Sequence, residues 1–332
     1  MSNADVEVSI VVPTYGQADK LARLLESLAA MTTPPAYEVI VVDDCSPDNT
    51  EAVVREWMQA PHPFATEYCK LARNAGPATA RNEGTRRARG RIVAYTDSDC
   101  VVDTAWLPSL VRKLDPEAGI VGVGGSVRPL NPEGFFSKYN TVNRILEPFD
   151  SLIYLVTANC CFMRDRVLEV GGFDEDVRVP GGEDVALSIK MIRQGWRFAF
   201  DTDAVVFHDY RERLRDFVKT WKNYAYGCGY VIGKYFEETP TVDPDEPWTR
   251  NTIRPPLMTP RLTRYVLRIE YDACKDAAVS RSQTLAFLLL RYFQMYIHYG
   301  YFRKGETVFI GRQSFRARCL WLLRNLPRLL AK

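Results

Sequence analysis

Two aspartates, Asp97 and Asp99, close an apolar run and are the first candidates for chemistry in this sequence. On an extended strand end, side chains two residues apart point to the same side, so both carboxylates would face one space. Such a pair suits a hard divalent cation, Mg²⁺ or Mn²⁺, that also binds phosphate oxygens. The Asp-Ser-Asp triplet is equally typical of a turn that ends a strand, and both interpretations stay open at this point.

A second carboxylate pair, Glu183 and Asp184, follows Gly181 and Gly182 at the start of a predicted amphipathic helix. A carboxylate held there could act as a base, and the helix N-terminus would favour its ionised form. The alternative is a helix cap, because aspartate is a favoured N-cap residue. His208 closes a later apolar run, and it is either a metal ligand or a structural histidine.

Short β-branched runs alternate with helical patterns, and this alternation predicts the elements that position these residues. The predicted strands are residues 6–13, 37–44, 65–72, 90–99, 119–127, 155–164 and 196–208. The predicted helices are residues 17–31, 49–59, 78–89 and 105–114, a helix after Gly182, and a helical region beyond residue 210. Such an order indicates an α/β fold with a mostly parallel sheet flanked by helices.

Polar side chains follow three of the predicted strands. Pro13, Thr14 and Tyr15 end the first strand, Asp44 ends the second, and residues 97–99 end the fourth. Ligands of parallel sheets bind beyond the carboxyl ends of the strands, so these residues are expected around one crevice. Tyr15 could stack there on a planar base, or it is an exposed aromatic residue without a ligand.

The order of these segments is far more specific than any one of them. V-V-P-T-Y, VVDDCSPDNT, N-A-G-P-A-T-A-R-N-E-G, D-S-D and G-G-E-D-V-A-L are followed by a late histidine. This order resembles the family 2 glycosyltransferases of the GT-A fold, over residues 8–210. The resemblance implies a nucleotide-sugar-binding catalytic domain at residues 1–210. It leaves residues 211–332 as a helical, basic region for the acceptor, a second copy or a membrane.

The resemblance also implies roles for the matching residues. Those it places at the nucleotide sugar are Pro13, Thr14, Tyr15, Asp44, Asn74, Arg81, Asp97 and Glu183. Asp97 and Asp99 match the DxD motif, whose second aspartate binds Mn²⁺ or Mg²⁺ directly. His208 matches a histidine that completes the metal site, and Asp184 matches the general base for the acceptor hydroxyl.

The implied reaction transfers a sugar from a nucleoside-diphosphate sugar, with a UDP-sugar favoured, to a glycan, lipid-linked or small-molecule acceptor. A single base without a carboxylate nucleophile fits one displacement and inversion, and the absence of the Q-x-x-R-W motif indicates a non-processive enzyme. The alternatives are a catalytically silent scaffold of this fold and a transferase that acts on a lipid phosphate. A nucleotidyltransferase or a dinucleotide-dependent oxidoreductase would need a glycine-rich loop where the sequence reads PTYGQAD.

Charge is divided unevenly along the 332 residues. Up to Phe207 there are 21 basic and 29 acidic side chains, and from His208 onward there are 22 and 12. The acidic part suits a metal site, and the basic part suits phosphate, an anionic acceptor or a membrane surface. No nucleic-acid partner is expected.

Cysteine usage and hydropathy indicate a cytoplasmic protein. The eight cysteines form no C-x-x-C pair and the chain has three histidines, so a structural zinc site is not expected. Cys160 and Cys161 lie in an apolar run and are predicted to be buried thiols. The N-terminus has no signal-peptide pattern. The apolar run at residues 285–302 is interrupted by Arg291, so it is not expected to span a bilayer.

The C-terminal segment, residues 315–330, is predicted to be an amphipathic helix. Residues 307–332 contain six basic and no acidic side chains. Such a helix would pack on the core or on a partner subunit in a homodimer. The alternative is reversible adhesion to anionic lipid, which would place the protein at the inner face of a membrane.

Overall fold

The computed structural model describes residues 6–147, 152–235 and 260–306. Eight strands form one sheet in the order β3-β2-β1-β4-β7-β6-β8-β5. The strands are β1 (Val8–Thr14), β2 (Tyr37–Asp43), β3 (Ala65–Lys70), β4 (Ile92–Tyr95), β5 (Cys100–Val102), β6 (Ile120–Pro129), β7 (Cys160–Met163) and β8 (Arg197–His208). Seven of these strands correspond to predicted ones, although β4 and β7 are shorter than the sequence indicated, and β5 was not predicted.

The pairing is mostly parallel, which confirms the predicted fold class. β1 pairs in parallel with β2 and β4, β2 with β3, and β6 with β8. β7 runs antiparallel to both of its neighbours, and the short β5 is antiparallel to β8. This last pairing matters for the site, because it sets Cys100 opposite His208.

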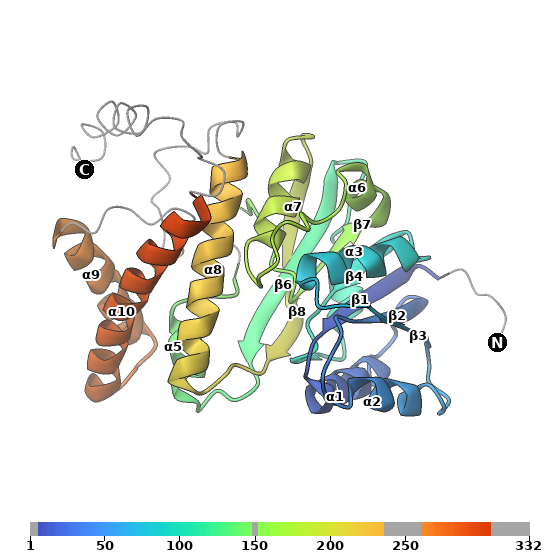
Figure 1. Ribbon diagram of the computed structural model, residues 1–332, viewed down its shortest axis with the longest axis horizontal. Helices are drawn as coiled ribbons and strands as arrows, with labels where there is room; N and C mark the ends of the chain where they lie inside the picture. Colours follow the sequence, from blue (N-terminus) through green and yellow to red (C-terminus); the bar gives the residue numbers. More distant parts are fainter. Residues whose placement is uncertain (1–5, 148–151, 236–259, 307–332) are drawn as a thin grey trace.

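Helices cover both faces of the sheet because its central strands are apolar on both sides. Along β1, Val8, Ile10 and Val12 pack into one core, and Val11 packs into the core on the other face. Figure 1 shows α1 and α2 on one side of the sheet and α3 and α6 on the other. The helices up to α7 are α1 (Ala18–Ala29), α2 (Thr50–Trp57), α3 (Pro77–Arg87), α4 (Trp106–Val111), α5 (Phe135–Val142), α6 (Arg164–Glu169) and α7 (Glu183–Ile192).

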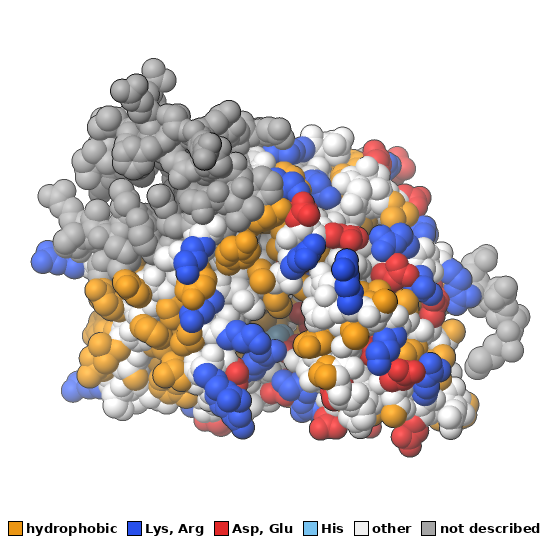
Figure 2. All heavy atoms as spheres, in the orientation of Figure 1, with side chains coloured by type: hydrophobic (Ala, Val, Ile, Leu, Met, Phe, Trp, Pro, Cys, Tyr) orange, Lys and Arg blue, Asp and Glu red, His pale blue; other side chains and the backbone are white. Residues whose placement is uncertain are grey.

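The C-terminal region is helical, as predicted. It consists of α8 (Leu214–Tyr235), α9 (Pro260–Asp276) and α10 (Arg281–Glu306). In Figure 1, α8 lies between the sheet and the α9–α10 pair. The α9–α10 pair also packs directly on α5, where the Tyr139 and Phe287 rings are in contact. Figure 2 shows hydrophobic side chains gathered over α9 and α10 on the left of this face. Large apolar side chains exposed on α10 are Leu285, Leu289, Tyr292, Phe293 and Tyr296.

None of the helices in the described ranges has the length and apolar character needed to cross a bilayer. This agrees with the expectation for residues 285–302, which lie within α10. Cys160 and Cys161 are both buried and free, as predicted. The amphipathic helix predicted at residues 315–330 lies outside the described residues.

Candidate functional site

The ends of β1 and β2 are joined by main-chain and side-chain hydrogen bonds. The Asp44 N–H donates to the Thr14 carbonyl at 2.9 Å. The Asp44 carboxylate accepts the N–H groups of Ala75 at 2.6 Å and Gly76 at 2.9 Å, and it is buried. Burial raises the pKa of Asp44, although these two hydrogen bonds oppose the rise. Asp44 therefore holds the loop that leads into α3 and carries Asn74.

The residues predicted at the nucleobase surround this junction. Pro13 and Thr14 are the last residues of β1, and the Thr14 hydroxyl is buried with no hydrogen-bond partner among the described residues. Tyr15 follows with 51% of its surface exposed, and Asn74 is exposed on the neighbouring loop. Tyr15 is thus free to stack on a planar ring at the carboxyl edge of the sheet.

Arg81 of α3 is the centre of a buried ion-pair group. Its Nη1 lies 2.8 Å from Oε1 of Glu183, and its Nη2 lies 2.7 Å from Oδ1 of Asp97. The Arg81 and Glu183 side chains are 4% and 5% exposed. Burial alone would lower the pKa of Arg81, but the charges of Asp97 and Glu183 raise it well above its usual value. The sequence placed Arg81 near the nucleotide and did not indicate that two of the predicted carboxylates bind it.

Asp97 and Asp99 do not face the same partners, so the prediction of an extended strand end is wrong. β4 ends at Tyr95, and residues 97–100 form a turn in which the Cys100 N–H donates to the Asp97 carbonyl at 3.0 Å. Asp97 binds Arg81, whereas Oδ1 of Asp99 lies 3.4 Å from Nε2 of His208. The turn, one of the two interpretations left open above, separates the roles of the two carboxylates.

The side chains of Asp99, Cys100 and His208 bring three ligand-type atoms within 4.8 Å of one another. Burial raises the pKa of the Cys100 thiol well above its usual value. Sulfur is also a soft ligand, which Mn²⁺ and Mg²⁺ do not favour. Asp99 and His208 remain, and Nδ1 of His208 is buried without a hydrogen-bond partner in the described part of the chain. A carboxylate and an imidazole together fit Mn²⁺ better than Mg²⁺, which prefers oxygen ligands. Asp97 is not in this group of three.

Gln17 joins this group, and nothing in its sequence position identified it. Its Nε2 lies 3.4 Å from Oδ2 of Asp99, and its Oε1 accepts the Ser98 hydroxyl at 2.7 Å. Gln17 immediately precedes α1, so the loop after β1 helps to orient the turn that carries Asp99. Only the sheet order, which sets β1 beside β4, brings these loops together.

Asp184 lies in the first turn of α7 and is not its N-cap, a position occupied by Gly182. Its Oδ1 accepts the Val185 N–H at 2.8 Å, and no hydrogen bond to its Oδ2 is found among the described residues. Both oxygens of Glu183 have partners, Arg81 and the Gly181 N–H. The neighbouring carboxylates therefore differ, because Asp184 alone retains an oxygen that can take a proton.

Burial, and then the charge of Glu183, raise the pKa of Asp184 to about 7. The helix N-terminus was expected to favour the ionised form of Asp184, but burial and the charge of Glu183 outweigh this effect. The hydrogen bond from Val185 favours the charged form, but desolvation outweighs it. A carboxyl with a pKa near neutrality is well matched to accepting a proton at physiological pH.

Helix α8 fixes the start of α7, and its contribution was missed by the sequence reasoning. Gly181 and Gly182 have φ values of 106° and 96°, which only glycine adopts readily. A Cβ on Gly227 of α8 would lie 1.7 Å from the Gly181 carbonyl oxygen. A Cβ on Gly181 would lie 2.5 Å from a ring carbon of Tyr224, which is also on α8. Burial raises the pKa of Tyr224, and the charges of Asp97 and Asp184 act on it in the same direction. The side chain of Tyr224 is therefore part of the site.

Gly227→Ala should displace α8 from the loop that carries Asp184. The added methyl would meet backbone atoms that cannot rotate away, so we expect a loss of about 1–3 kcal/mol in the free energy of unfolding. A displacement near 1 Å should also slow turnover by about 10²-fold. Gly300→Ala in α10 is the matched control, because its Cβ would meet open space. It should raise stability by up to about 1 kcal/mol and leave turnover unchanged. Equal effects of the two variants, in melting and rate measurements, would contradict this account.

Two family models match the chain. The model described as "Glycosyl transferase family group 2" matches residues 92–322, and that described as "Glycosyl transferase family 2" matches residues 9–169. The chain is 30% identical over 229 residues to the pre-mycofactocin glycosyltransferase of Mycobacterium tuberculosis, which covers 64% of this chain and 44% of that protein. It is 28% identical over 214 residues to glycosyltransferase AglE of Haloferax volcanii, covering 61% of this chain and 67% of that protein.

Among solved structures, the chain is similar to the mannosyltransferase PcManGT from Pyrobaculum calidifontis in complex with GDP-Man and Mn²⁺. The TM-score is 0.63 at 21% identity, and the match covers 94% of this chain and 89% of that one. This likeness concerns the fold. The present chain spans less than half the length of the mycobacterial relative.

Proposed function

Because the chain belongs to the family 2 glycosyltransferases, we propose that it transfers a sugar from a nucleoside-diphosphate sugar to an acceptor hydroxyl, with inversion and without processivity. The observation that supports this most strongly is the double ion pair of Arg81, which joins Asp97 to Glu183. It ties the turn that carries Asp99 to the helix start that carries Asp184. The proposed cation site and the proposed base would therefore face one crevice.

The nucleotide would lie at the carboxyl ends of β1 and β2. Tyr15 offers an exposed ring for the base, and Asn74 offers an amide on the loop that Asp44 holds. Asp44 would contact the nucleotide with its carboxylate, and it would also position the loop that carries Asn74. We place a UDP-sugar first as donor. The GDP-Man in the mannosyltransferase of similar fold makes a GDP-sugar the next candidate.

Asp99 and His208 are the residues that would hold a divalent cation. Their ligand atoms are 3.4 Å apart, and both side chains are largely shielded from solvent. When bound, Mn²⁺ or Mg²⁺ would neutralise the negative charge that develops on the diphosphate leaving group. Arg81 cannot take this role, because Asp97 and Glu183 already occupy its guanidinium.

Asp184 would act as the general base. The acceptor oxygen forms its bond to the anomeric carbon as the bond from that carbon to the diphosphate breaks, and the diphosphate leaves with the electron pair. The acceptor proton passes to Oδ2 of Asp184, the oxygen without a hydrogen-bond partner in the described structure. One displacement from the face opposite the leaving group inverts the anomeric centre.

A catalytically silent scaffold of this fold is the alternative from another functional class. In such a protein, the carboxylate at the position of the base could be permanently neutral or ion-paired, because no proton transfer is needed. Glu183 is ion-paired in this way, but Asp184 is not, and this difference favours an enzyme.

Donor identity is tested by a thermal-shift screen of UDP-, GDP- and dTDP-sugars, each with and without Mn²⁺. A ligand that binds the folded state at about 100 times its Kd stabilises it by about 2.7 kcal/mol, which raises the melting temperature by several degrees. We expect a UDP-sugar with Mn²⁺ to give the largest rise. No rise with any nucleotide sugar, with or without the cation, would contradict the proposed function.

A further inference from the structure

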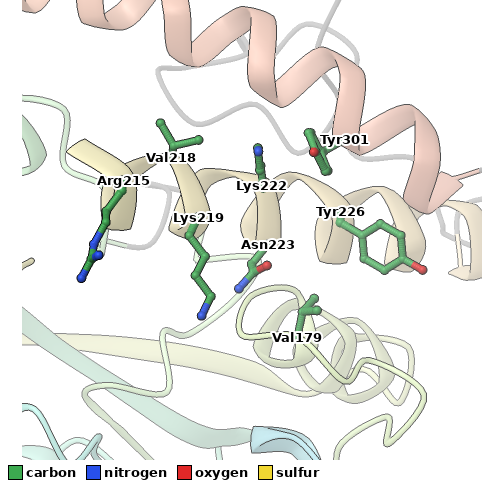
Figure 3. A pocket seen from close by; sticks show the side chains of 8 residues that line it. All are labelled: Val179, Arg215, Val218, Lys219, Lys222, Asn223, Tyr226 and Tyr301. Atoms are coloured by element: carbon green, nitrogen blue, oxygen red, sulfur yellow. The ribbon is translucent and has the colours of Figure 1, made fainter. Parts of the chain in front are cut away.

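A groove of about 380 Å³ lies along one side of α8, against the loop that precedes α7 and the C-terminal part of α10. Arg215, Lys219 and Lys222 come from successive turns of α8. Figure 3 shows Lys219 extending toward Val179 of the loop, whereas Lys222 extends toward α10 and Tyr301. The basic residues follow the i, i+4, i+7 spacing of one helix face. The groove therefore combines a line of cations with apolar and aromatic walls.

Among the residues that the structure describes, few carboxylates lie near the cations of this groove. Arg215 has a carboxylate, that of Asp216, at 3.6 Å from its Nε. Within the described ranges, neither Lys219 nor Lys222 has a carboxylate within 4.0 Å, and Nζ of Lys222 instead lies 5.2 Å from the centre of the Tyr301 ring. Like charges held together in a hollow create a positive potential that an anionic ligand would relieve.

The groove adjoins the catalytic crevice through the elements that line both. Val179 lies on the loop that continues into Gly181, Gly182 and the base Asp184. Asn223, also in the groove, immediately precedes Tyr224, whose side chain contacts Gly181 and feels the charges of Asp97 and Asp184. A molecule in the groove would thus meet the crevice on the side of the base, opposite the nucleotide-binding ends of β1 and β2.

We propose that this groove binds the acceptor and recognises a phosphate or phosphodiester group on it. The inference rests on the proposed function, because it names the chemistry of the second substrate. Lys219, Lys222 and Arg215 would bind the phosphate, while Val179 and Tyr301 contact the adjoining carbon skeleton. The donor diphosphate would occupy the cation site at Asp99, so the groove would hold the acceptor phosphate apart from it while a hydroxyl of the acceptor reaches the base.

Binding of two probes tests this directly. Glycerol 3-phosphate represents a soluble phosphate, and farnesyl phosphate represents a lipid-linked one; both are titrated calorimetrically into the full chain. The double variant Lys219→Gln with Lys222→Gln should bind the responding probe at least tenfold more weakly, because each lysine supplies a charged hydrogen bond. The control removes the same two charges elsewhere, at the exposed Lys113 and Lys275, and should bind as the wild type does.

Response to both probes, or to either one, supports the groove and identifies the source of the phosphate. Absence of binding by both probes, or equal weakening by the control variant, overturns the proposal. Displacement of a bound probe by UDP also overturns it, since the groove would then belong to the donor. If the double variant does not fold, Lys219→Glu replaces it, because that side chain is exposed and makes no ion pair in the described structure.

Donor binding is measured on the same samples. It distinguishes a failure of the groove proposal from a failure of the proposed function. A wild-type protein that binds a nucleotide sugar but neither phosphate probe refutes the groove and leaves the proposed function standing. A protein that binds phosphate probes but no nucleotide sugar refutes the proposed function. The lysine variants should retain wild-type affinity for the donor, because none of the residues proposed to bind the donor lies on α8.

Discussion

Replacing Asp184 by asparagine is expected to slow release of the nucleoside diphosphate by roughly 10²–10⁴, the range typical of losing a positioned base. Asparagine has nearly the same size and can still accept the Val185 N–H, but it cannot take a proton. Affinity for the nucleotide sugar should stay near that of the wild type, since Asp184 lies on the acceptor side. The measurement uses the donor selected by thermal shift, with water or an added acceptor as nucleophile.

The pH profile offers a second readout of the same residue. Burial and the charge of Glu183 raise the pKa of Asp184 to about 7, and only the deprotonated form is a base. The wild-type rate should therefore rise about tenfold per pH unit below 7 and level off above it. Stability should respond in the opposite sense. A carboxyl with a higher pKa in the folded chain than its unfolded value, roughly 4, destabilises the fold as pH rises through this range.

Asp184→Asn removes that unfavourable charge, so at pH 8 its melting temperature should equal or exceed that of the wild type. A structural capping role predicts the reverse, a lower melting temperature with little change in rate. Asp165→Asn is the matched control. The Asp165 side chain is 90% exposed, and its Oδ1 lies 3.9 Å from Nη1 of Arg164, so it makes at most a weak ion pair. Turnover of Asp184→Asn within a few-fold of the wild type would mean that another group is the base.

Asp99→Ala, or removal of divalent cations by a chelator, should reduce transfer by about 10³-fold or more. Charge stabilisation by a bound cation is worth several kcal/mol, and each 1.36 kcal/mol, approximately, is a factor of ten in rate. Mn²⁺ should restore the chelated wild type but not Asp99→Ala. Donor affinity, measured with and without Mn²⁺, should lose its dependence on the cation in this variant.

His208→Ala should weaken the effect of Mn²⁺ less than Asp99→Ala does, because a neutral ligand is lost while the carboxylate remains. Asp165→Asn again serves as the control and should respond to Mn²⁺ as the wild type does. Full activity after exhaustive chelation would show that the group around Asp99 and His208 is not a metal site. The Asp184 experiments would still test the base in that case, because they do not depend on a metal site.

Local sequence pattern determined most of the fold. The continuous β-branched runs of β1 and β2 and the helical spacing of α1 depend on which side chains are apolar, and burial of those side chains drives each element into place. The rule that ligands bind at the carboxyl ends of parallel strands then identified Tyr15, Asp44 and the turn after β4 as one region. Short-range chemistry also indicated Glu183 and Asp184, because they follow two glycines at a helix start.

Tertiary structure alone decided what each of these carboxylates does. Asp97 and Asp99 are alike in sequence, but Arg81 takes the first, and the pairing of β5 with β8 brings His208 to the second. Asp184 differs from Glu183 because Glu183 forms an ion pair with Arg81, whereas burial raises the pKa of Asp184. The groove beside them forms between α8, α10 and a loop far apart in sequence. Such properties depend on distances between residues that are far apart in the sequence, and the local sequence pattern does not specify these distances.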